Sequence, residues 1–174
     1  MRRRPSRAAR GLLIAGIALA LATGHAAPAG EPRLGPETNL PLPRFVTLNS
    51  DKANARRGPG LSHRIDWVFL RRGLPLEVLA EHGHWRKVVD SDGAGGWVHH
   101  GLLRGGRAAV ITARPEAPLR AEPRAGAALV ARVQTGVVAQ IRGCRAEWCE
   151  LSVEGARGWA EKADFWGARA DEAF

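Results

Sequence analysis

Two cysteines and six histidines are the first candidates in this sequence for metal binding or nucleophilic catalysis. A cysteine nucleophile needs a histidine base, but Cys144 and Cys149 lie far along the chain, whereas every histidine lies at or before position 100. His82 and His84 would face the same side of a strand, yet no cysteine or close His-x-x-x-His pair completes a zinc site there. We therefore expect no enzymatic activity, no cofactor and no metal site, with the histidines in solvated turns and at strand edges.

The tryptophans are stronger candidates for a binding role. The chain has six Trp and no Tyr. Trp85 precedes Val88 by three residues, as Trp148 precedes Leu151, so within each pair the two side chains fall on opposite faces of a strand. If Val88 and Leu151 fill a core, the two indoles face outward, where each could stack on a sugar ring or an amide. The alternative is that they pack against another part of the chain or cover an open end of the fold.

These tryptophans lie in a segment that the chain contains twice. Five pairs of residues correspond at an offset of 63 positions: Gly73 with Gly136, Leu74 with Val137, Val78 with Ile141, Trp85 with Trp148 and Val88 with Leu151. With one residue fewer in the second copy, Gly96-Trp97-Val98 aligns with Gly158-Trp159-Ala160. A period of about 60 residues is too long for a solenoid unit and suits a small all-β module. We therefore predict two copies of one domain, over residues 45–104 and 107–167, followed by a tail over residues 168–174.

The repeat also bears on the two cysteines. Cys144 and Cys149 are separated by four residues, which suits facing positions on two strands joined by a tight turn, where the Cβ atoms come close enough to bridge. In the other copy the same two positions are Glu81 and Arg86, an opposite-charge pair. Two ways of joining one hairpin indicate a structural site, because an ion pair would not replace a redox or metal function. We predict a disulfide that stabilises the fold by roughly 2 kcal/mol.

The first 26 residues have the pattern of a secretory signal peptide. Five arginines precede an apolar run from Gly11 to Thr23, which leads to small residues at Gly24, Ala26 and Ala27. The run is too short to span a bilayer comfortably. We expect cleavage near Ala26, a periplasmic or secreted location, and no stable membrane span after cleavage; the alternative is that this segment remains as an anchor. Export to an oxidising compartment also favours the disulfide.

Charge and proline content characterise the rest of the chain. All 17 acidic residues but only 21 of the 26 basic ones lie beyond the predicted signal peptide, which leaves a net charge of +4 there. Such a mixed charge argues against a dedicated nucleic-acid-binding protein, which would show a clustered basic face, and is compatible with weak attraction to anionic envelope polymers. Five prolines between residues 27 and 44 disfavour helix and sheet, so we expect an extended, semi-rigid Pro-rich linker there.

Short runs of β-forming residues separated by turns fill both copies. The runs of the first copy are residues 45–49, 67–70, 74–82, 85–90 and 96–99, and those of the second are 129–133, 137–142, 148–153 and 158–161. No amphipathic helix of useful length interrupts them. We therefore predict the all-β fold class, with two tandem small β-barrels that are closed or nearly closed. Because only residues 104–107 link the copies, the barrels should touch.

The order of these motifs resembles that of bacterial SH3-type domains. The first copy contains an opening strand, the segment Asn54-Ala55-Arg56-Arg57-Gly58-Pro59-Gly60, a Trp-x-x-Val strand from Trp85 to Val88, and a closing Gly96-Trp97-Val98. The second copy departs from the pattern, because Pro118-Leu119-Arg120 stands in place of Asn-Ala-Arg and Ala160 in place of the closing Val. The resemblance covers Phe45 to about Gly167 and implies two SH3-like barrels. It also implies an exported cell-envelope protein, since such domains are often attached to peptidoglycan-cleaving enzymes and are thought to bind wall peptide or glycan.

On these grounds we expect a non-catalytic exported module that binds peptidoglycan or another cell-envelope polymer. The candidate ligand contacts are a mixed polar and aromatic set: Arg56, Asp66, Trp67 and Trp85. The absence of Tyr argues against a polyproline groove lined by such aromatic residues. The alternative is a protein-interaction adaptor, which would dock an envelope protein through an exposed barrel edge or the Pro-rich linker. Because the second copy departs from the family pattern, it could serve only as support.

Overall fold

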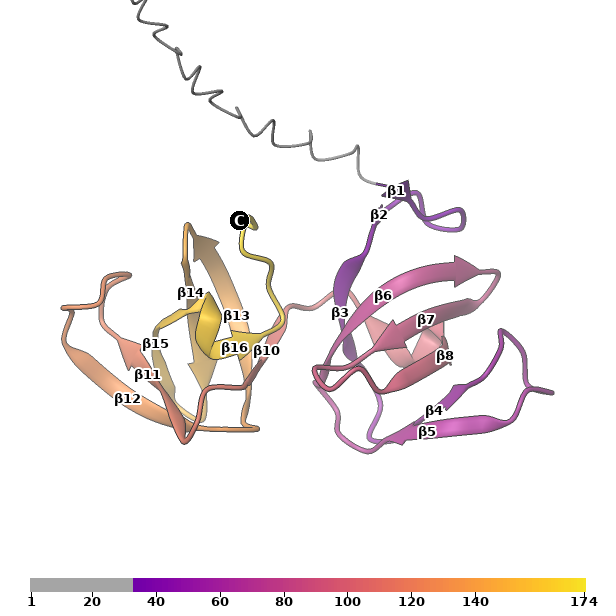
Figure 1. Cartoon of the computed structure of the whole chain (residues 1–174), viewed down its shortest axis with the longest axis horizontal. Coiled ribbons are helices and arrows are strands. Elements are labelled where there is room, and N and C mark those ends of the chain that lie inside the picture. The colour runs from indigo at the N-terminus through magenta and orange to yellow at the C-terminus, as the bar shows by residue number, and fades with distance from the viewer. Residues whose placement is uncertain (1–32) are drawn as a thin grey trace, which may run out of the picture. The chain divides into compact units, whose positions relative to one another are not determined.

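The computed structural model describes residues 33–174 of the chain. The predicted signal peptide and the first part of the Pro-rich linker lie outside these residues. Within the described part of the chain, no helix is long and apolar enough to cross a membrane. Residues 32–174 belong to one unit, which contains both copies of the repeat (Figure 1).

Strands dominate the secondary structure, so the all-β prediction is confirmed. A small hairpin opens the described chain, with β1 over Arg33–Leu34 and β2 over Pro41–Leu42. The first barrel contains β3 (Arg44–Leu48), β4 (Ala53–Arg56), β5 (Ile65–Phe69), β6 (Pro75–His82), β7 (Trp85–Val89), β8 (Gly95–His99), the 3₁₀ helix η1 (His100–Leu102) and β9 (Leu103–Arg104). The second contains β10 (Ala108–Ile111), β11 (Glu116–Arg120), β12 (Leu129–Gln134), β13 (Val138–Arg145), β14 (Trp148–Val153), β15 (Ala156–Glu161), the 3₁₀ helix η2 (Lys162–Asp164) and β16 (Phe165–Trp166).

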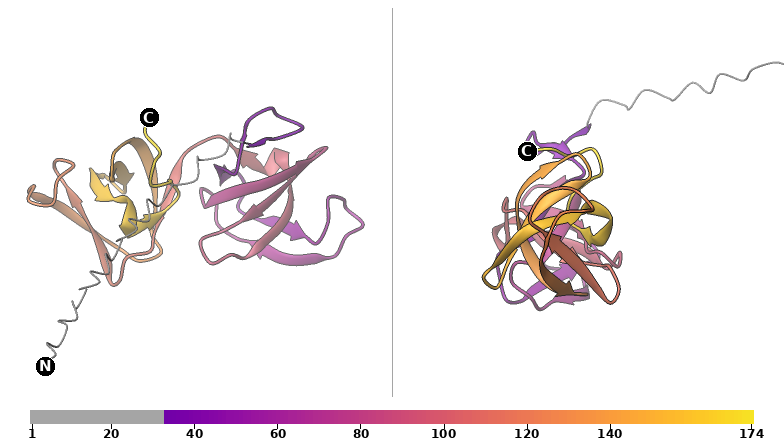
Figure 2. Two further views of the ribbon diagram at one scale, coloured as in Figure 1. Left: turned by 45° about the horizontal axis from the view of Figure 1, so that its top comes forward. Right: turned by 90° about the vertical axis from the view of Figure 1, so that its left-hand side faces the viewer.

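The two barrels have the same topology, strand for strand. The first sheet has the order β5-β4-β8-β7-β6-β3-β9 and the second the order β12-β11-β15-β14-β13-β10-β16. Even the irregularities correspond, because the β4–β5 register shifts between Ala55 and Arg56 and the β11–β12 register between Leu119 and Arg120. Figure 2 shows how each sheet curls around on itself. The predicted duplication of one small barrel is therefore confirmed.

Each barrel has its own hydrophobic core on the inner face of its sheet. Val88 and Leu151 are completely buried in these cores, which is the condition under which the sequence places the two indoles on the outer face. Trp85 and Trp148, which fall on the opposite faces of the same strands, are half-buried. The period-two alternation of strand side chains therefore sorts core from surface correctly at these four positions.

The long central hairpin of each barrel is joined at the same two positions. In the second barrel Cys144 and Cys149 face each other across β13 and β14, with their Cα atoms 4.1 Å apart, and form the predicted disulfide. In the first barrel Glu81 and Arg86 face each other across β6 and β7, with Arg86 Nε 3.4 Å from Glu81 Oε1. All four residues are buried. Cross-strand pairing therefore explains both the disulfide and the ion pair.

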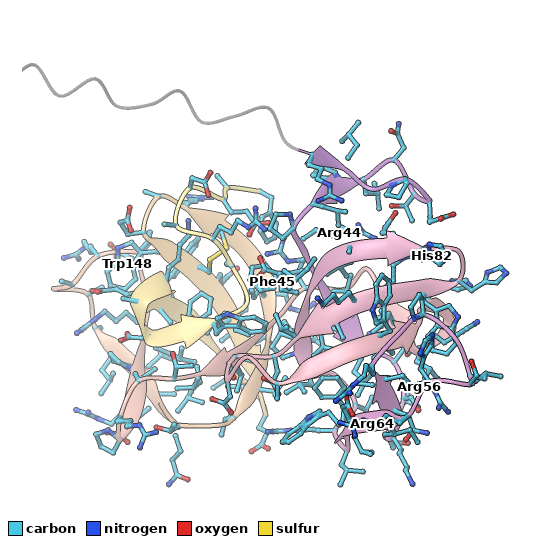
Figure 3. All side chains as sticks on the ribbon, turned by 45° about the vertical axis from the view of Figure 1, so that its right-hand side comes forward. Arg44, Phe45, Arg56, Arg64, His82 and Trp148 are labelled. Carbon is cyan, nitrogen blue, oxygen red and sulfur yellow. A yellow bond between two sulfur atoms is a disulfide. The ribbon has the colours of Figure 1, made fainter. Side chains whose placement is uncertain are left out.

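The Pro-rich segment differs from the extended linker expected over residues 27–44, because its described part folds back as the β1–β2 hairpin. The carboxylate of Glu81 holds this hairpin against the first barrel. It accepts hydrogen bonds from the backbone N–H groups of Glu37 and Thr38, at 3.0 Å each, and from the Thr38 hydroxyl at 2.7 Å. Arg44, which is labelled in Figure 3, donates to the same carboxylate at 2.6 Å. The many prolines correctly indicated that the described part of this segment forms no helix. They gave no indication that the carboxylate of Glu81, more than 40 positions away, would hold it.

The ionisation of Glu81 depends on these contacts. Its side chain is completely buried, and burial raises the pKa of the carboxyl. The hydrogen bonds from Thr38, Arg44 and the two backbone N–H groups outweigh burial and lower the pKa to about 2. Glu81 is therefore a buried, fully partnered carboxylate at neutral pH.

The tail plays the corresponding part in the second barrel. Arg107, which lies 63 positions after Arg44, forms an ion pair with Glu172. Phe174 exchanges two backbone hydrogen bonds with Cys144, at 3.0 and 3.3 Å. A terminal segment of the described chain therefore covers the end of the central hairpin in both barrels.

The two barrels contact each other, as the short link between them requires. The rings of Phe45 in β3 and Trp166 in β16 meet edge to face, with their centroids 4.9 Å apart. Arg71, in the loop before β6, donates a hydrogen bond to the carbonyl of Gly136 at 2.6 Å. One contact is apolar and the other polar, so side chains as well as the link connect the barrels.

Candidate ligand-binding site

A pocket of about 260 Å³ lies on the first barrel, and we call it the Trp85 pocket. Its lining combines cations, an amide, an imidazole, an indole and two leucines: Lys52, Asn54, Arg56, Leu61, Trp85, His99 and Leu102. These side chains come from β4 and its flanking loops, from β7 and β8, and from η1. The pocket is thus assembled by the sheet topology from segments spread over 51 positions of sequence.

Strand β4 supplies two of the polar groups through its alternation. Ala53 and Ala55 point into the core and are completely or almost completely buried. Asn54 and Arg56 therefore point to the opposite face, where both line the pocket. Because Ala53 and Ala55 are small, the strand packs closely against the core. This packing holds Asn54 and Arg56 on a rigid element.

Arg56 also orders the loop that completes the pocket. Its Nη1 donates to the carbonyl of Leu61 at 3.0 Å and to that of His63 at 2.6 Å. Figure 3 shows Arg56 at the hairpin formed by β4 and β5. Within the described residues its Nε and Nη2 donate no hydrogen bond, so two of the three guanidinium nitrogens remain for a ligand.

Trp85 and His99 face each other across β7 and β8. Their rings meet edge to face, with centroids 5.7 Å apart. His84, His99 and His100 form a cluster with ring centroids 4.8 to 5.9 Å apart, and His99 Nδ1 accepts a hydrogen bond from the backbone N–H of Gly101 at 3.2 Å. Burial lowers the pKa of His100, and the positive charge of its basic neighbours lowers it further. In the described chain, no group of three or more His, Cys, Asp or Glu is arranged to hold a metal ion.

The sequence placed four residues in the site, and the structure brings two of them together. Arg56 and Trp85 line the pocket, whereas Asp66 and Trp67 are not among its lining residues. Sequence reasoning missed the other five lining residues: Lys52, Asn54, Leu61, His99 and Leu102. A signal existed for Asn54, because a residue two positions before Arg56 on a strand shares its face. The rest depend on cross-strand register and loop path, which were not deduced from the sequence.

Asp66 and Trp67 lie on β5, at the edge of the sheet. Asp66 is paired with Arg57 at 3.1 Å and with Arg64 at 2.6 Å, and the hydrogen bond from Arg57 is the main reason that its pKa is lowered. Trp67 pairs with Ala55 across β4 and β5, so it shares the inner face of the sheet and not the face of the pocket. Its side chain is nevertheless 46% exposed. Strand alternation therefore separates Trp67 from Arg56, and the register shift after Ala55 separates Asp66 from it, because Arg56 pairs with Ile65.

The equivalent surface of the second barrel has different chemistry. Strand pairing and spacing give the following replacements: Glu116 for Lys52, Pro118 for Asn54, Arg120 for Arg56, Ala125 for Leu61, Trp148 for Trp85, Glu161 for His99 and Asp164 for Leu102. Arg120 keeps the loop-ordering bond, donating to the carbonyl of Ala127 at 3.0 Å. Burial raises the pKa of Asp164, the charge of Glu161 raises it further, and Arg120 lowers it. Three acids and one cation thus replace two cations and no acid. Glu116 is paired with Arg132 at 2.9 Å, so the main change beside Arg120 is the pair of acids Glu161 and Asp164, and the second surface lacks the positive excess of the first.

Comparison with known proteins agrees with the duplicated architecture. The family model for the bacterial SH3 domain matches residues 49–105 and again residues 113–167. No curated protein matches the chain.

Two solved structures from Trichomonas vaginalis, those of NlpC2 and NlpC1, are similar to the chain. Each is 13% identical, with a TM-score of 0.34; the similarity covers 72% and 78% of this chain and 48% and 49% of the NlpC chains, respectively. The chain therefore spans about half the length of those structures. Because the two matches to one family model together cover more than half of the chain, the chain belongs to the bacterial SH3 domain family, with two domains in tandem.

Proposed function

We propose that this chain is a non-catalytic cell-envelope protein that binds peptidoglycan through the Trp85 pocket of its first barrel. Bacterial SH3 domains are binding domains and are often cell-wall-binding modules, which is the general support for the proposal. The buried disulfide fits an oxidising location outside the cytoplasm, in agreement with the signal peptide expected from the sequence. The observation that carries the proposal is the joint presence of an indole and an incompletely used guanidinium in one pocket.

The chemistry of the pocket suits the components of peptidoglycan, which combines sugar rings, amides and free carboxylates. Trp85 offers an apolar ring for a sugar face or an amide. Arg56 and Lys52 offer charge-assisted hydrogen bonds to a carboxylate, and Asn54 can both donate and accept. A volume of about 260 Å³ suits a short segment, such as the end of one wall peptide or a single sugar unit.

We infer that the first barrel binds and that the second supports it. The second barrel keeps the arginine and tryptophan of the site, but Glu161 and Asp164 stand beside them. These carboxylates would repel a ligand carboxylate and compete for Arg120. The second barrel has Pro118 at the position of Asn54, so it also lacks the side-chain amide.

The state of the two cysteines favours binding over catalysis. The chain contains two cysteines, and both are joined in the buried disulfide. Neither sulfur is then available as the thiolate nucleophile of a wall peptidase. The remaining polar groups of the pocket can hold a ligand, but no nucleophile accompanies them among its lining residues.

Retention on purified peptidoglycan sacculi tests this proposal. The full exported chain should be retained, and Trp85→Ala should lower retention on the order of tenfold, as expected for a central aromatic contact. Trp148→Ala is the matched control, because it removes the equivalent indole from the second barrel. Equal loss in both variants, or in neither, would contradict binding at the Trp85 pocket.

A second candidate function rests on the edge strand β5. Within the described sheet β5 pairs only with β4, and it exposes Ile65 and Trp67 at 45% and 46%. An exposed apolar edge can accept a strand from a partner protein. Under this alternative the chain would not be retained on sacculi, and an envelope protein would co-purify with the native chain but not with Trp67→Ser.

A further inference from the structure

We propose that the chain has a second binding site, separate from the Trp85 pocket, for a polyanion with repeated phosphate or carboxylate groups. The site is a hollow of about 770 Å³ whose lining residues come from both barrels and from the link between them. Five of the lining residues are arginines: Arg71, Arg72, Arg104, Arg107 and Arg142. We call it the arginine hollow.

Two of these arginines already have carboxylate partners. Arg72 Nε lies 3.2 Å from Asp51 Oδ1, and Arg107 is held by Glu172. Their charge is largely balanced, so they contribute little to the attraction of an anion. The proposal therefore does not depend on them.

The other three arginines have no carboxylate partner among the described residues. Arg71 donates to a backbone carbonyl, Arg104 donates to the hydroxyl of Thr47 at 3.0 Å, and the side chain of Arg142 forms no hydrogen bond within the described part of the chain. All three are exposed. A guanidinium that donates to a neutral oxygen keeps its charge and several further donors. The lining contains a single acid, Glu154, so three arginines without a carboxylate partner face one lining carboxylate. Arg142 also acts through its charge on Glu150, which is itself paired with Arg157.

The repeat shows that the fold itself does not require these arginines. Arg71 corresponds to Gln134, Arg104 to Trp166 and Arg142 to Leu79. The same strands and loops therefore form in the other copy with an uncharged residue at each position. Arg71 and Arg104 also serve the structure through their hydrogen bonds to Gly136 and Thr47. Arg142 has no such side-chain contact among the described residues, so a structural role does not explain its charge.

The form of the hollow favours a chain of charges over a single ion. Its volume is about three times that of the Trp85 pocket, and its unbalanced cations come from three separate elements: the loop before β6, strand β9 and strand β13. Arginine binds phosphate and carboxylate oxygens through two parallel N–H groups. A linear polyanion can place successive oxyanion groups on such spaced cations, whereas a small anion can meet only one or two of them.

Titration of the full exported chain with short-chain inorganic polyphosphate at low salt tests the proposal. We expect saturable binding that weakens with rising salt, as counterions are released. Replacing Arg71 with Gln, the residue of the other copy, together with Arg142→Gln should weaken binding on the order of tenfold and lower the salt dependence by roughly two counterions. Arg114→Gln is the matched control, because Arg114 is exposed and is not among the residues lining the hollow.

Two further measurements separate ligand binding from loss of structure and carboxylate binding from phosphate binding. Arg71 also links the barrels, so Arg142→Gln alone must weaken binding severalfold without changing the circular dichroism or thermal midpoint of the chain. Polygalacturonate, whose charges are carboxylates, distinguishes the source of the oxyanion. Trp85→Ala should leave polyphosphate binding unchanged, which separates this site from the peptidoglycan site. Absence of binding to both polymers, or equal weakening by Arg114→Gln and Arg142→Gln, would overturn the proposal.

Discussion

The central hairpin is joined by an ion pair in the first barrel and by a disulfide in the second, although the backbone positions are the same. Glu81 does more than face Arg86, because its four closest donors come from the N-terminal hairpin and from Arg44. The Cys144–Cys149 disulfide joins its two strands covalently, and the tail reaches the same position through the backbone of Cys144, which exchanges two hydrogen bonds with Phe174. The comparison shows that the fold has a cross-strand link at this site in both barrels, while the chemistry of the link decides how the terminal segment is held: through the side chain of Glu81 in the first barrel and through the backbone of Cys144 in the second.

The outer surfaces of the two barrels also combine shared positions with different chemistry. Both have an arginine that orders a loop and a tryptophan beside it, namely Arg56 with Trp85 and Arg120 with Trp148. Around this shared pair the first barrel has cations and the second has acids. A duplicated scaffold has therefore kept the groups that shape the surface and changed the groups that would select a ligand.

The largest effect that tests this comparison is expected from Glu81→Gln. The substitution leaves the buried Arg86 and the half-buried Arg44 beside a neutral amide, which should cost about 3 to 5 kcal/mol of the free energy of unfolding. Denaturant unfolding followed by tryptophan fluorescence measures the loss. Glu150→Gln, which removes an exposed ion pair with Arg157 from the second barrel, is the control and should cost less than about 1 kcal/mol. Similar losses in the two variants would show that Glu81 has no special role.

Acid should remove the same stabilisation from the native chain. The pKa of Glu81 is about 2 in the folded state and 4.5 ordinarily, so between these values the unfolded chain binds the proton more tightly. Stabilisation on the order of 3 kcal/mol is therefore complete above pH 4.5 and is lost as the pH falls toward 2. Unfolding measured across this range should show a steeper pH dependence for the native chain than for Glu81→Gln, and identical curves would contradict the pairing.

Reduction of the disulfide should have a smaller effect on the second barrel. The closed loop is short, so its loss should cost roughly 2 kcal/mol of the free energy of unfolding. Unfolding with and without reductant measures this difference, and Cys144→Ser with Cys149→Ser serves as the reductant-independent comparison. A larger loss than that of Glu81→Gln would reverse the order that we assign to the two links.

The smallest effect is expected when residues of the Trp85 pocket are placed on the equivalent surface of the second barrel. Glu116→Lys with Pro118→Asn and Glu161→His gives the second barrel three lining residues of the Trp85 pocket. We expect a severalfold rise in retention on sacculi, because a cation and neutral groups replace two repelling carboxylates. The test is made in the Trp85→Ala background, where no increase would show that these residues do not select the ligand.

The sequence was sufficient to predict the duplicated all-β fold, the disulfide and the opposite faces of Trp85 and Val88 on their strand, because each depends on period and on local pairing. The hairpin at Glu81 was not predicted, since its acceptor lies more than 40 positions from the segment that it holds. In the candidate site, the sequence signals led to Arg56 and Trp85 but added Asp66, which the register shift in β4–β5 places elsewhere. Features set by non-local register are thus the ones that sequence reasoning missed.

Backbone and indole N–H resonances of the full exported chain, titrated with soluble peptidoglycan fragments, test most directly whether one barrel binds and the other supports it. The signals of Trp85 and Asn54 should shift with a common saturation curve, while those of Trp148 and Arg120 should remain unchanged. Shifts of equal size around Trp85 and Trp148, or no shift around either tryptophan, would contradict the central claim.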